Sequence, residues 1–184
     1  MVSKQKPVTN AELAVLSLLA EQPMHGYQIE QTIESRGMRE WTEIGFSSIY
    51  YILEKLHSRG YVERHLEPAQ SKGPSRQVFS LTPAGRAVFH QAVLTALSSP
   101  SRSFSSFQLG LASLPMLGKK DILNALLNYQ TLLKNKFAEL AAGSTERNKL
   151  PWHVTALFQH DLNLLQCEMR WLEEFIHTVE TRPG

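Results

Sequence analysis

The fold is decided by residues 47–66, which read SSIYYILEKLHSRGYVERHL. Four aliphatic residues in the first half recur at i, i+3, i+4 and i+7, so they form one apolar face of a helix. These residues are Ile49, Ile52, Leu53 and Leu56. Gly60 ends that helix, and residues 61–66 follow as a short strand. A second strand is expected at 76–81, after a polar loop of turn-forming residues at 67–75. The stretch therefore predicts a helix that leads directly into a β-hairpin.

Two shorter helices are expected before this stretch and one after it. The first begins near Asn10, a good N-cap residue, and ends at Pro23. The second begins near His25 and ends at Gly37, which suits a C-cap. After the hairpin, Thr82 caps a further helix that has a proline at its first position. Three helices followed by a hairpin is the order of a winged helix-turn-helix domain.

A serine-rich stretch divides the chain. Residues 98–106 contain six serines, and serine disfavours helix interiors, so this stretch predicts a linker. We therefore expect a winged helix-turn-helix domain over residues 1–97 and an all-helical domain over residues 98–184. The second domain has long helical patterns over 119–142 and 151–181. The predicted fold class is mainly α.

Composition excludes several classes of protein. The 184 residues include 42% hydrophobic residues, a formal net charge of +2 and a single cysteine, Cys167. One cysteine rules out an internal disulfide framework. No apolar run reaches the length of a transmembrane helix, and no signal-peptide core precedes Pro23. We expect a globular cytoplasmic protein without membrane contact.

The sequence does not predict an enzyme, a cofactor or a metal site. The Walker A, zincin and nucleophile-elbow motifs are missing from the sequence. The spacing of His153, His160 and Cys167 is seven residues each time, which places them two helical turns apart. One zinc ion cannot bridge that gap, so solvated histidines are the simpler interpretation.

The third helix has the properties of a recognition helix. The major groove of DNA, about 12 Å wide, admits one α-helix, and the helix face opposite the aliphatic residues carries Ser47, Ser48 and two tyrosines. The beginning of the second helix offers a phosphate site, and basic residues of the hairpin offer phosphate contacts. The predicted DNA-binding residues are His25, Tyr27, Gln28, Ser47, Ser48, Tyr50, Tyr51, Lys55, Arg64, Lys72 and Arg76. The alternative is that the tyrosines only pack or are solvated and that the hairpin is an ordinary polar tip.

Several short motifs resemble those of the PadR-like family of transcriptional regulators. They are AVLSLL (14–19), HGYQI (25–29), GFSSIYYILEKL (45–56), GYV (60–62), GPSRQVFSLTPAG (73–85) and EMRWLEE (168–174). Two departures stand out: Tyr51 occupies a position where the family often has proline, and the wing lacks the family's glycine–arginine start. The resemblance implies a homodimer that binds a pseudo-palindromic DNA operator and is held together by its C-terminal helices.

The last helix also predicts a dimer from its own pattern. Beside its main apolar row, Leu157, Leu164 and Trp171 form a second row that one neighbouring helix cannot cover. The predicted dimerisation residues are Leu157, Leu164, Leu165, Trp171, Leu172 and Phe175. The alternative is a monomeric bundle in which Trp171 is covered internally.

A small aromatic effector is a further hypothesis, because some relatives are released from DNA by such molecules. Aromatic walls favour flat apolar ligands. The candidate pocket residues are Phe104, Phe107, Trp152 and Trp171. The alternative is that these aromatic residues belong to the core.

The combined interpretation is a homodimeric, sequence-specific DNA-binding regulator, and we expect a repressor because repression requires only occupancy of a promoter. A transcriptional activator of the same family is one alternative. A winged-helix module for protein contacts is another, and it would favour an acidic recognition face. Here Glu54 is the one acid on the exposed face of the third helix.

Overall fold

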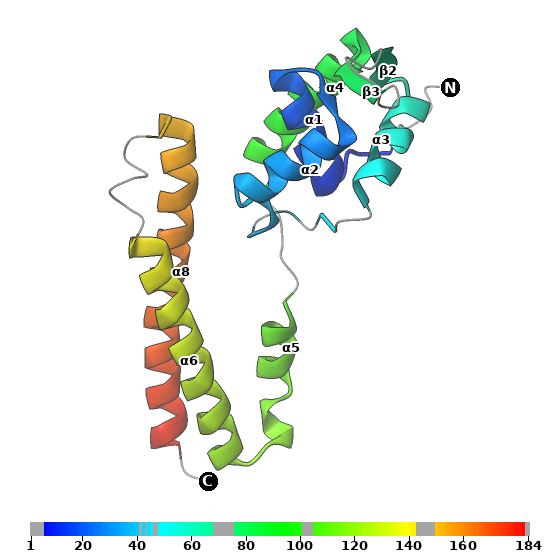
Figure 1. Cartoon of the computed structure of the whole chain (residues 1–184). Helices are drawn as coiled ribbons and strands as arrows, with labels where there is room; N and C mark the ends of the chain where they lie inside the picture. The colour runs from blue at the N-terminus through cyan, green and yellow to red at the C-terminus, as the bar shows by residue number, and fades with distance from the viewer. Residues whose placement is uncertain are drawn as a thin grey trace. The chain divides into compact units, whose positions relative to one another are not determined.

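Figure 1 shows the computed structural model of the chain. The residues that the structure describes are 6–40, 42, 44–45, 48–67, 76–100, 105–142 and 150–182, without the side chains of Glu40 and Arg76. The chain forms two compact units, Met1–Arg102 and Ser103–Gly184, and each is described by itself. The division between them falls inside the serine-rich stretch. The chain is mainly helical with a small antiparallel sheet, which confirms the predicted fold class.

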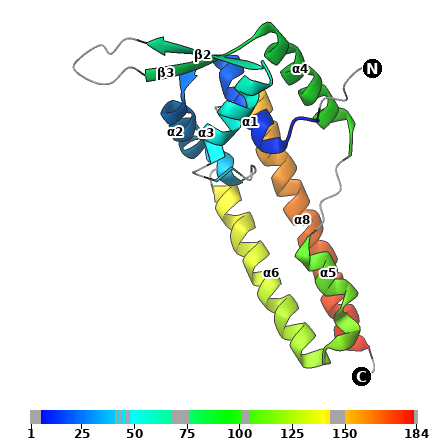
Figure 2. The ribbon, with the colours of Figure 1, turned by 90° about the vertical axis from the view of Figure 1, so that its right-hand side faces the viewer.

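The N-terminal unit has the predicted order of three helices, a hairpin and a fourth helix. Its elements are α1 (Asn10–Glu21), β1 (Met24–His25), α2 (Gly26–Ser35), the 3-10 turn η1 (Met38–Glu40), α3 (Ser48–Ser58), β2 (Val62–Glu67), β3 (Arg76–Leu81) and α4 (Pro83–Ser98). Figure 2 shows β2 and β3 side by side as the hairpin. Their register runs from Val62 opposite Leu81 to Glu67 opposite Arg76.

The strand β1 was not predicted from the sequence. Met24 pairs with Phe79 and His25 with Val78, so the sheet has the order β1-β3-β2. A two-residue strand has no periodicity that a sequence pattern could reveal. Its consequence is local but important, because it ties the beginning of α2 to the hairpin.

Local capping interactions set the ends of the helices. The cap of α1 is Thr9 and not Asn10, so that prediction was wrong by one residue. Thr9 Oγ1 accepts a hydrogen bond from the Glu12 N–H at 3.2 Å, and Glu12 Oε2 accepts one from the Thr9 N–H at 2.9 Å. This reciprocal capping box satisfies two backbone donors, which outweighs the preference of asparagine for the cap position.

Two glycines and a threonine confirm the other predicted helix ends. Gly37 and Gly60 have φ angles of 60° and 72°, a backbone conformation that glycine adopts without strain. They follow α2 and α3, as expected. Thr82 caps α4 through a 3.0 Å hydrogen bond from the Gly85 N–H to its Oγ1, with Pro83 at the first helical position.

The core of the N-terminal unit is formed by one face of each helix and of the sheet. All four aliphatic residues that the pattern placed on one face of α3 are buried. They pack with buried residues of the other helices and of the hairpin, including Leu16 of α1, Ile33 of α2 and Phe79 of β3. Burial of this face leaves the opposite face of α3 toward solvent.

In its described residues, 105–142 and 150–182, the C-terminal unit contains helices and no strand, as predicted. Its elements are α5 (Ser106–Ala112), the 3-10 turn η2 (Leu114–Met116), α6 (Lys119–Ala142) and α8 (Trp152–Thr181). Figures 1 and 2 both show α6 alongside α8. Leu126 and Leu133 of α6 pack against Leu172 and Ile176 of α8 as the buried core of this pair. In the described ranges, we find no helix with a stretch both long and apolar enough to span a membrane.

Candidate nucleic-acid interface

The exposed face of α3 carries two adjacent tyrosines. Tyr50 is 57% exposed and Tyr51 is 69% exposed, whereas Ile49 and Leu53 are fully buried. Contiguous exposed apolar surface, as two adjacent tyrosines provide, is typical of binding sites. The structure thus places both tyrosines where the pattern expected them, and their contact with DNA stays a prediction.

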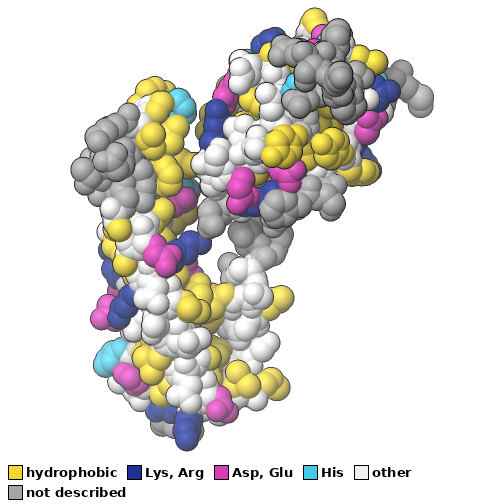
Figure 3. Space-filling view, in the orientation of Figure 1, with side chains coloured by type: hydrophobic (Ala, Val, Ile, Leu, Met, Phe, Trp, Pro, Cys, Tyr) yellow, Lys and Arg dark blue, Asp and Glu magenta, His cyan; other side chains and the backbone are white. Residues whose placement is uncertain are grey.

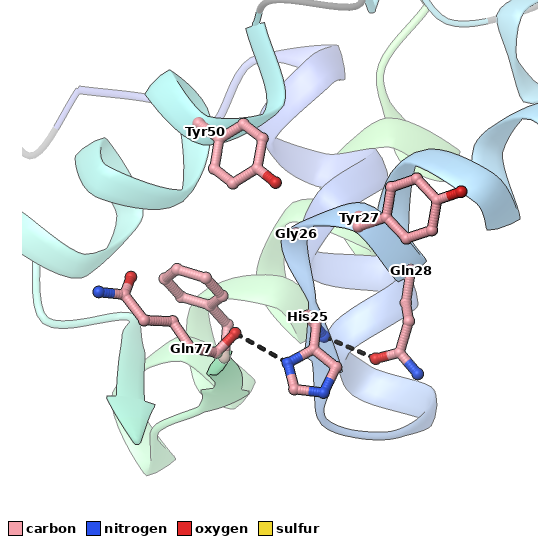
Figure 4. A pocket seen from close by; sticks show the side chains of 7 residues that line it. His25, Gly26, Tyr27, Gln28, Tyr50 and Gln77 are labelled. Atoms are coloured by element: carbon pink, nitrogen blue, oxygen red, sulfur yellow. Dashed lines mark hydrogen bonds between the residues drawn. The ribbon is translucent and has the colours of Figure 1, made fainter. Parts of the chain in front are cut away.

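The beginning of α2 lies beside this face. The His25 N–H donates to Gln28 Oε1 at 2.8 Å, and His25 Nδ1 lies 3.1 Å from the backbone oxygen of Gln77 on β3. Figure 4 shows both hydrogen bonds, and it shows Tyr27 and Gln28 on α2 opposite Tyr50 on α3. The first backbone N–H groups of a helix have no intrahelical acceptor, so this end of α2 favours an anion.

A cleft of about 470 Å³ opens where α2, α3 and β3 meet. Its lining consists of His25, Gly26, Tyr27, Gln28, Tyr50, Gln77 and Phe79. Gly26 is essential to this packing, because a Cβ at that position would lie 2.7 Å from Tyr50 Cε1. The glycine of the HGY motif therefore lets the Tyr50 ring lie against the beginning of α2. Four predicted DNA-binding residues thus line a single cleft: His25 of β1, Tyr27 and Gln28 of α2, and Tyr50 of α3.

Lys55 is placed differently from the prediction. Its ammonium is 2.7 Å from Glu12 Oε1 of α1, and the Glu12 side chain is 1% exposed. Arg59, which directly follows the end of α3, contacts the same carboxylate at 3.3 Å. The sequence predicts that Lys55 faces DNA, whereas in the structure its ammonium pairs with Glu12 and fastens α3 to α1.

The charges around Glu12 explain how a buried carboxylate is tolerated. Burial alone raises the pKa of Glu12, but the hydrogen bond from Lys55, the backbone hydrogen bond from Thr9 and the charges of Lys55 and Arg59 outweigh it. The net result is a pKa below the ordinary value of 4.5. Glu12 is therefore ionised at neutral pH, as a buried ion-paired acid should be.

The described strands of the wing are less basic than expected. Arg64 Nη1 on β2 is 3.0 Å from Glu54 Oε1 on α3, so its charge is already paired. Glu63 and Glu67 lie on the same strand, and Glu67 is 3.7 Å from His25 Nε2. The strand β2 thus carries two acids beside the basic residue that the sequence analysis selected.

Some predicted DNA-binding residues lie outside the described part of the chain. These are Ser47 and Lys72, together with the side chain of Arg76. Ser48, which begins α3, is half-buried, and its hydroxyl donates to the backbone oxygen of Gly45. Their roles toward DNA stay predictions.

The predicted dimerisation residues separate into an inner and an outer group. Leu172 is fully buried against α6 within the chain, so its assignment to a dimer interface is corrected. Leu165 and Phe175 are partly buried against the same intrachain core. The second apolar row is different: Leu157, Leu164 and Trp171 remain partly or largely exposed, Leu164 most of all at 56%. Figure 3 shows hydrophobic side chains reaching the surface of this unit.

The predicted aromatic pocket does not form within one chain. Phe107 of α5 stacks on Tyr129 at 4.5 Å and meets Trp171 edge-on at 6.0 Å, and Trp171 stacks on Phe175. Trp152 begins α8 and lies about 28 Å from Trp171 along the axis of that helix. A single chain cannot bring both tryptophans to one ligand, and Phe104 lies outside the described residues.

Sequence reasoning missed three features of this region. The role of Gly26 in seating Tyr50 and the presence of Gln77 and Phe79 in the cleft depend on β1, which has no sequence signature. The Glu12–Lys55 pair did have a signal. Glu12 is an acid at the third position of a helix with a threonine cap, which marks a capping box. Such an acid on a buried face needs a cation nearby.

The three helices, the hairpin and the exposed face of α3 define the N-terminal unit as a winged helix-turn-helix domain. Residues 15–91 match the sequence profile described as the transcriptional regulator PadR-like family. This match covers most of the N-terminal unit, which is thus similar to the PadR-like family of transcriptional regulators.

One curated protein is similar in sequence to part of this chain. The chain is 35% identical over 98 residues to an uncharacterized 37.1 kDa protein in transposon Tn4556 of Streptomyces fradiae, covering 53% of this chain and 26% of that protein. The chain thus spans about a quarter of the length of this relative.

Among solved structures, Bacillus subtilis PadR in complex with operator DNA has a TM-score of 0.73 at 18% identity, covering 91% of this chain and 98% of that one. The same protein with p-coumaric acid has a TM-score of 0.74 at 20% identity, covering 94% and 99%. The PadR-like regulator BC1756 of Bacillus cereus has a TM-score of 0.62 at 17% identity, covering 96% and 99%. Because these sequence identities are 20% or less, the similarity to these structures shows a shared fold only.

Proposed function

We propose that this chain is a homodimeric repressor that binds a pseudo-palindromic DNA operator through its winged helix-turn-helix domain. One observation carries the proposal: Tyr50 and Tyr51 stand exposed on α3 beside the cleft at the beginning of α2. This combination offers side chains for base edges and backbone N–H groups for a phosphate on one surface. The match of residues 15–91 to the PadR-like family model supports it.

The contacts with DNA divide into two kinds. Ser47, Ser48, Tyr50 and Tyr51 face the major groove or its flanking phosphates. The end of α2 with His25, Tyr27 and Gln28 holds one backbone phosphate, because the helix dipole and free N–H groups attract negative charge. Lys72 and Arg76 of the wing add contacts that do not depend on sequence, and Arg64 joins them when it leaves Glu54.

The proposed dimer uses the outer row of α8. Leu157, Leu164 and Trp171 recur every seven residues and keep exposed surface after α6 has covered the inner row. Covering this apolar stripe with the same stripe of a second chain gives a two-fold symmetric pair. A two-fold protein requires two half-sites in inverted orientation, about one helical turn apart or a multiple of it.

The proposed release signal is a small aromatic molecule. The relative from Bacillus subtilis has a structure with p-coumaric acid, and this chain has a cluster of aromatic side chains around Phe107 and Trp171. Tryptophan fluorescence during titration with p-coumaric acid and a panel of related aromatic acids tests this part. Unchanged emission across the panel would remove the aromatic effector from the proposal.

The experiment that tests the proposed function is selection of genomic DNA fragments by the purified full-length chain at two salt concentrations, with sequencing of the bound fragments. We expect an inverted repeat with half-sites about one helical turn apart, enriched at both salt concentrations. Enrichment that disappears uniformly at higher salt would show purely electrostatic binding and contradict a sequence-specific regulator. A transcription assay on the recovered promoter then distinguishes a repressor from an activator.

A further inference from the structure

The exposed face of α3 ends in an acid rather than a base. Over the whole of α3, the exposed side chains are Tyr50, Tyr51, Glu54 and Ser58. Glu54 lies one turn after the two tyrosines on the same face, since residues three and four apart are neighbours on a helix. It is 57% exposed at its side chain. A surface that contacted only phosphates would not place a carboxylate here, because like charges repel.

The cations nearest to this face along the chain, one in α3 and one directly after it, contact a residue of α1 instead. Lys55 and Arg59 both contact the buried carboxylate of Glu12 on α1. Arg59 also lies over the Tyr61 ring at 4.7 Å. Their charges therefore do not neutralise Glu54, and the charge that does so comes from the wing.

Arg64 of β2 holds the Glu54 carboxylate at 3.0 Å, with both side chains about half exposed. An exposed ion pair of this kind contributes less than about 1 kcal/mol and exchanges readily with other partners. When a phosphate approaches the hairpin, Arg64 can turn to it, and the Glu54 carboxylate then needs a hydrogen-bond donor. Among major-groove base edges, the N4 amine of cytosine is the donor that suits a carboxylate. Adenine also has an amine, but the acceptor N7 beside that amine disfavours a carboxylate.

From these observations we propose that Glu54 is a specificity-determining residue that selects a cytosine in each half-site by accepting a hydrogen bond from its N4 amine. This inference rests on the proposed function. It adds one base preference to that function. Arg64 acts as the positioning partner, because it holds the carboxylate on the exposed face in the free protein and releases it when it turns to a backbone phosphate.

The test is selection from randomised double-stranded DNA by the full-length chain and three variants. Glu54→Ala removes the carboxylate, and Glu54→Gln replaces it with an amide, which pairs with adenine instead. Glu63→Gln is the matched control. It removes the same charge from the residue next to Arg64, but adjacent strand residues point to opposite faces of the sheet.

We expect the unchanged chain and Glu63→Gln to enrich cytosine at one position of each half-site, with about tenfold weaker binding when that base is replaced. Glu54→Gln should shift the preference toward adenine, and Glu54→Ala should reduce it to less than about twofold. An identical motif in Glu54→Ala would overturn the assignment. The assignment would also be overturned if Glu54→Ala lost affinity equally for every DNA sequence and had a lower melting temperature. The Glu54–Arg64 pair would then only stabilise the hairpin. If the unchanged chain enriches no motif at all, the proposed function itself fails.

Discussion

Glu12 of α1 and Lys55 of α3 form an ion pair of 2.7 Å in which the carboxylate is almost completely buried. The same Glu12 closes the capping box of α1 and contacts Arg59. One side chain thus fixes the beginning of the first helix and the rotation of the helix that carries the exposed tyrosines. This arrangement makes the stability of the domain depend on a buried charge that is not part of the exposed face of α3.

The first prediction concerns the charge of Glu12. Glu12→Gln keeps a side chain that can close the capping box but removes the charge opposite Lys55 and Arg59. We expect a loss of about 2 kcal/mol in the free energy of unfolding, measured by urea denaturation. Glu21→Gln is the control, because Glu21 pairs with Arg36 on the surface and should cost less than about 1 kcal/mol. Equal losses in the two variants would contradict the argument from burial.

The pH dependence of stability follows from the same residue. The pKa of Glu12 is lowered in the folded protein, so the folded state binds its proton less readily than the unfolded state does. The stabilisation is present above the ordinary pKa of 4.5 and is lost as the pH falls through the lowered pKa. The difference in unfolding free energy between the unchanged chain and Glu12→Gln should therefore shrink below pH 4.5. A difference that stays constant down to pH 3 would contradict it.

The second helix and the recognition helix are coupled through Gly26. Gly26→Ala would place a Cβ 2.7 Å from Tyr50 Cε1, so the ring must move away from the beginning of α2. We expect operator affinity to fall about tenfold, equivalent to about 1.4 kcal/mol, with little change in melting temperature. Fluorescence anisotropy with the selected operator measures it. In a Tyr50→Ala background, Gly26→Ala should have no further effect, since the two residues act through one contact.

Substitution of Gly85 should reduce the stability of the fold more than substitution of Gly26. A Cβ there would lie 1.9 Å from the backbone oxygen of Tyr61, and a backbone atom cannot yield as a side-chain end can. We expect Gly85→Ala to cost at least about 2 kcal/mol in thermal or urea unfolding. Gly110→Ala in α5 is the matched control, because the new Cβ has no neighbour within 4 Å. That substitution should be neutral or stabilising by up to about 1 kcal/mol.

Substitution of Leu164 should affect the assembly of the dimer, whereas substitution of Leu172 should affect the stability of the fold. Leu164→Lys puts a charge on the outer row of α8, so we expect the proposed dimer to dissociate in sedimentation velocity while the helical content by circular dichroism is unchanged. Leu172→Ala removes a fully buried side chain and should cost about 2–5 kcal/mol in unfolding free energy. A dimer that survives Leu164→Lys would exclude this row from the interface.

The sequence predicted those parts of the fold that repeat along the chain. The i, i+3, i+4, i+7 spacing of α3 located its buried face, and Gly37, Gly60 and Thr82 marked helix ends because their roles are local. Pairings between distant segments could not be predicted. The β1–β3 pair, the contact of Lys55 with Glu12 and the burial of Leu172 each join residues far apart in sequence. Lys55 illustrates the cause, because it lies at the edge of the buried face and its partner is on another helix.

The short strand β1 has a consequence for protein engineering. It joins Met24 and His25 to the hairpin, and His25 also hydrogen-bonds to Gln77 across that junction. A wing exchanged between two regulators of this family would therefore arrive without its third strand unless the residues before α2 were transferred as well. The smallest segment set that can be transferred as a unit is therefore discontinuous in the gene. A graft that carries only the contiguous hairpin should leave the start of α2 without its pairing to β3.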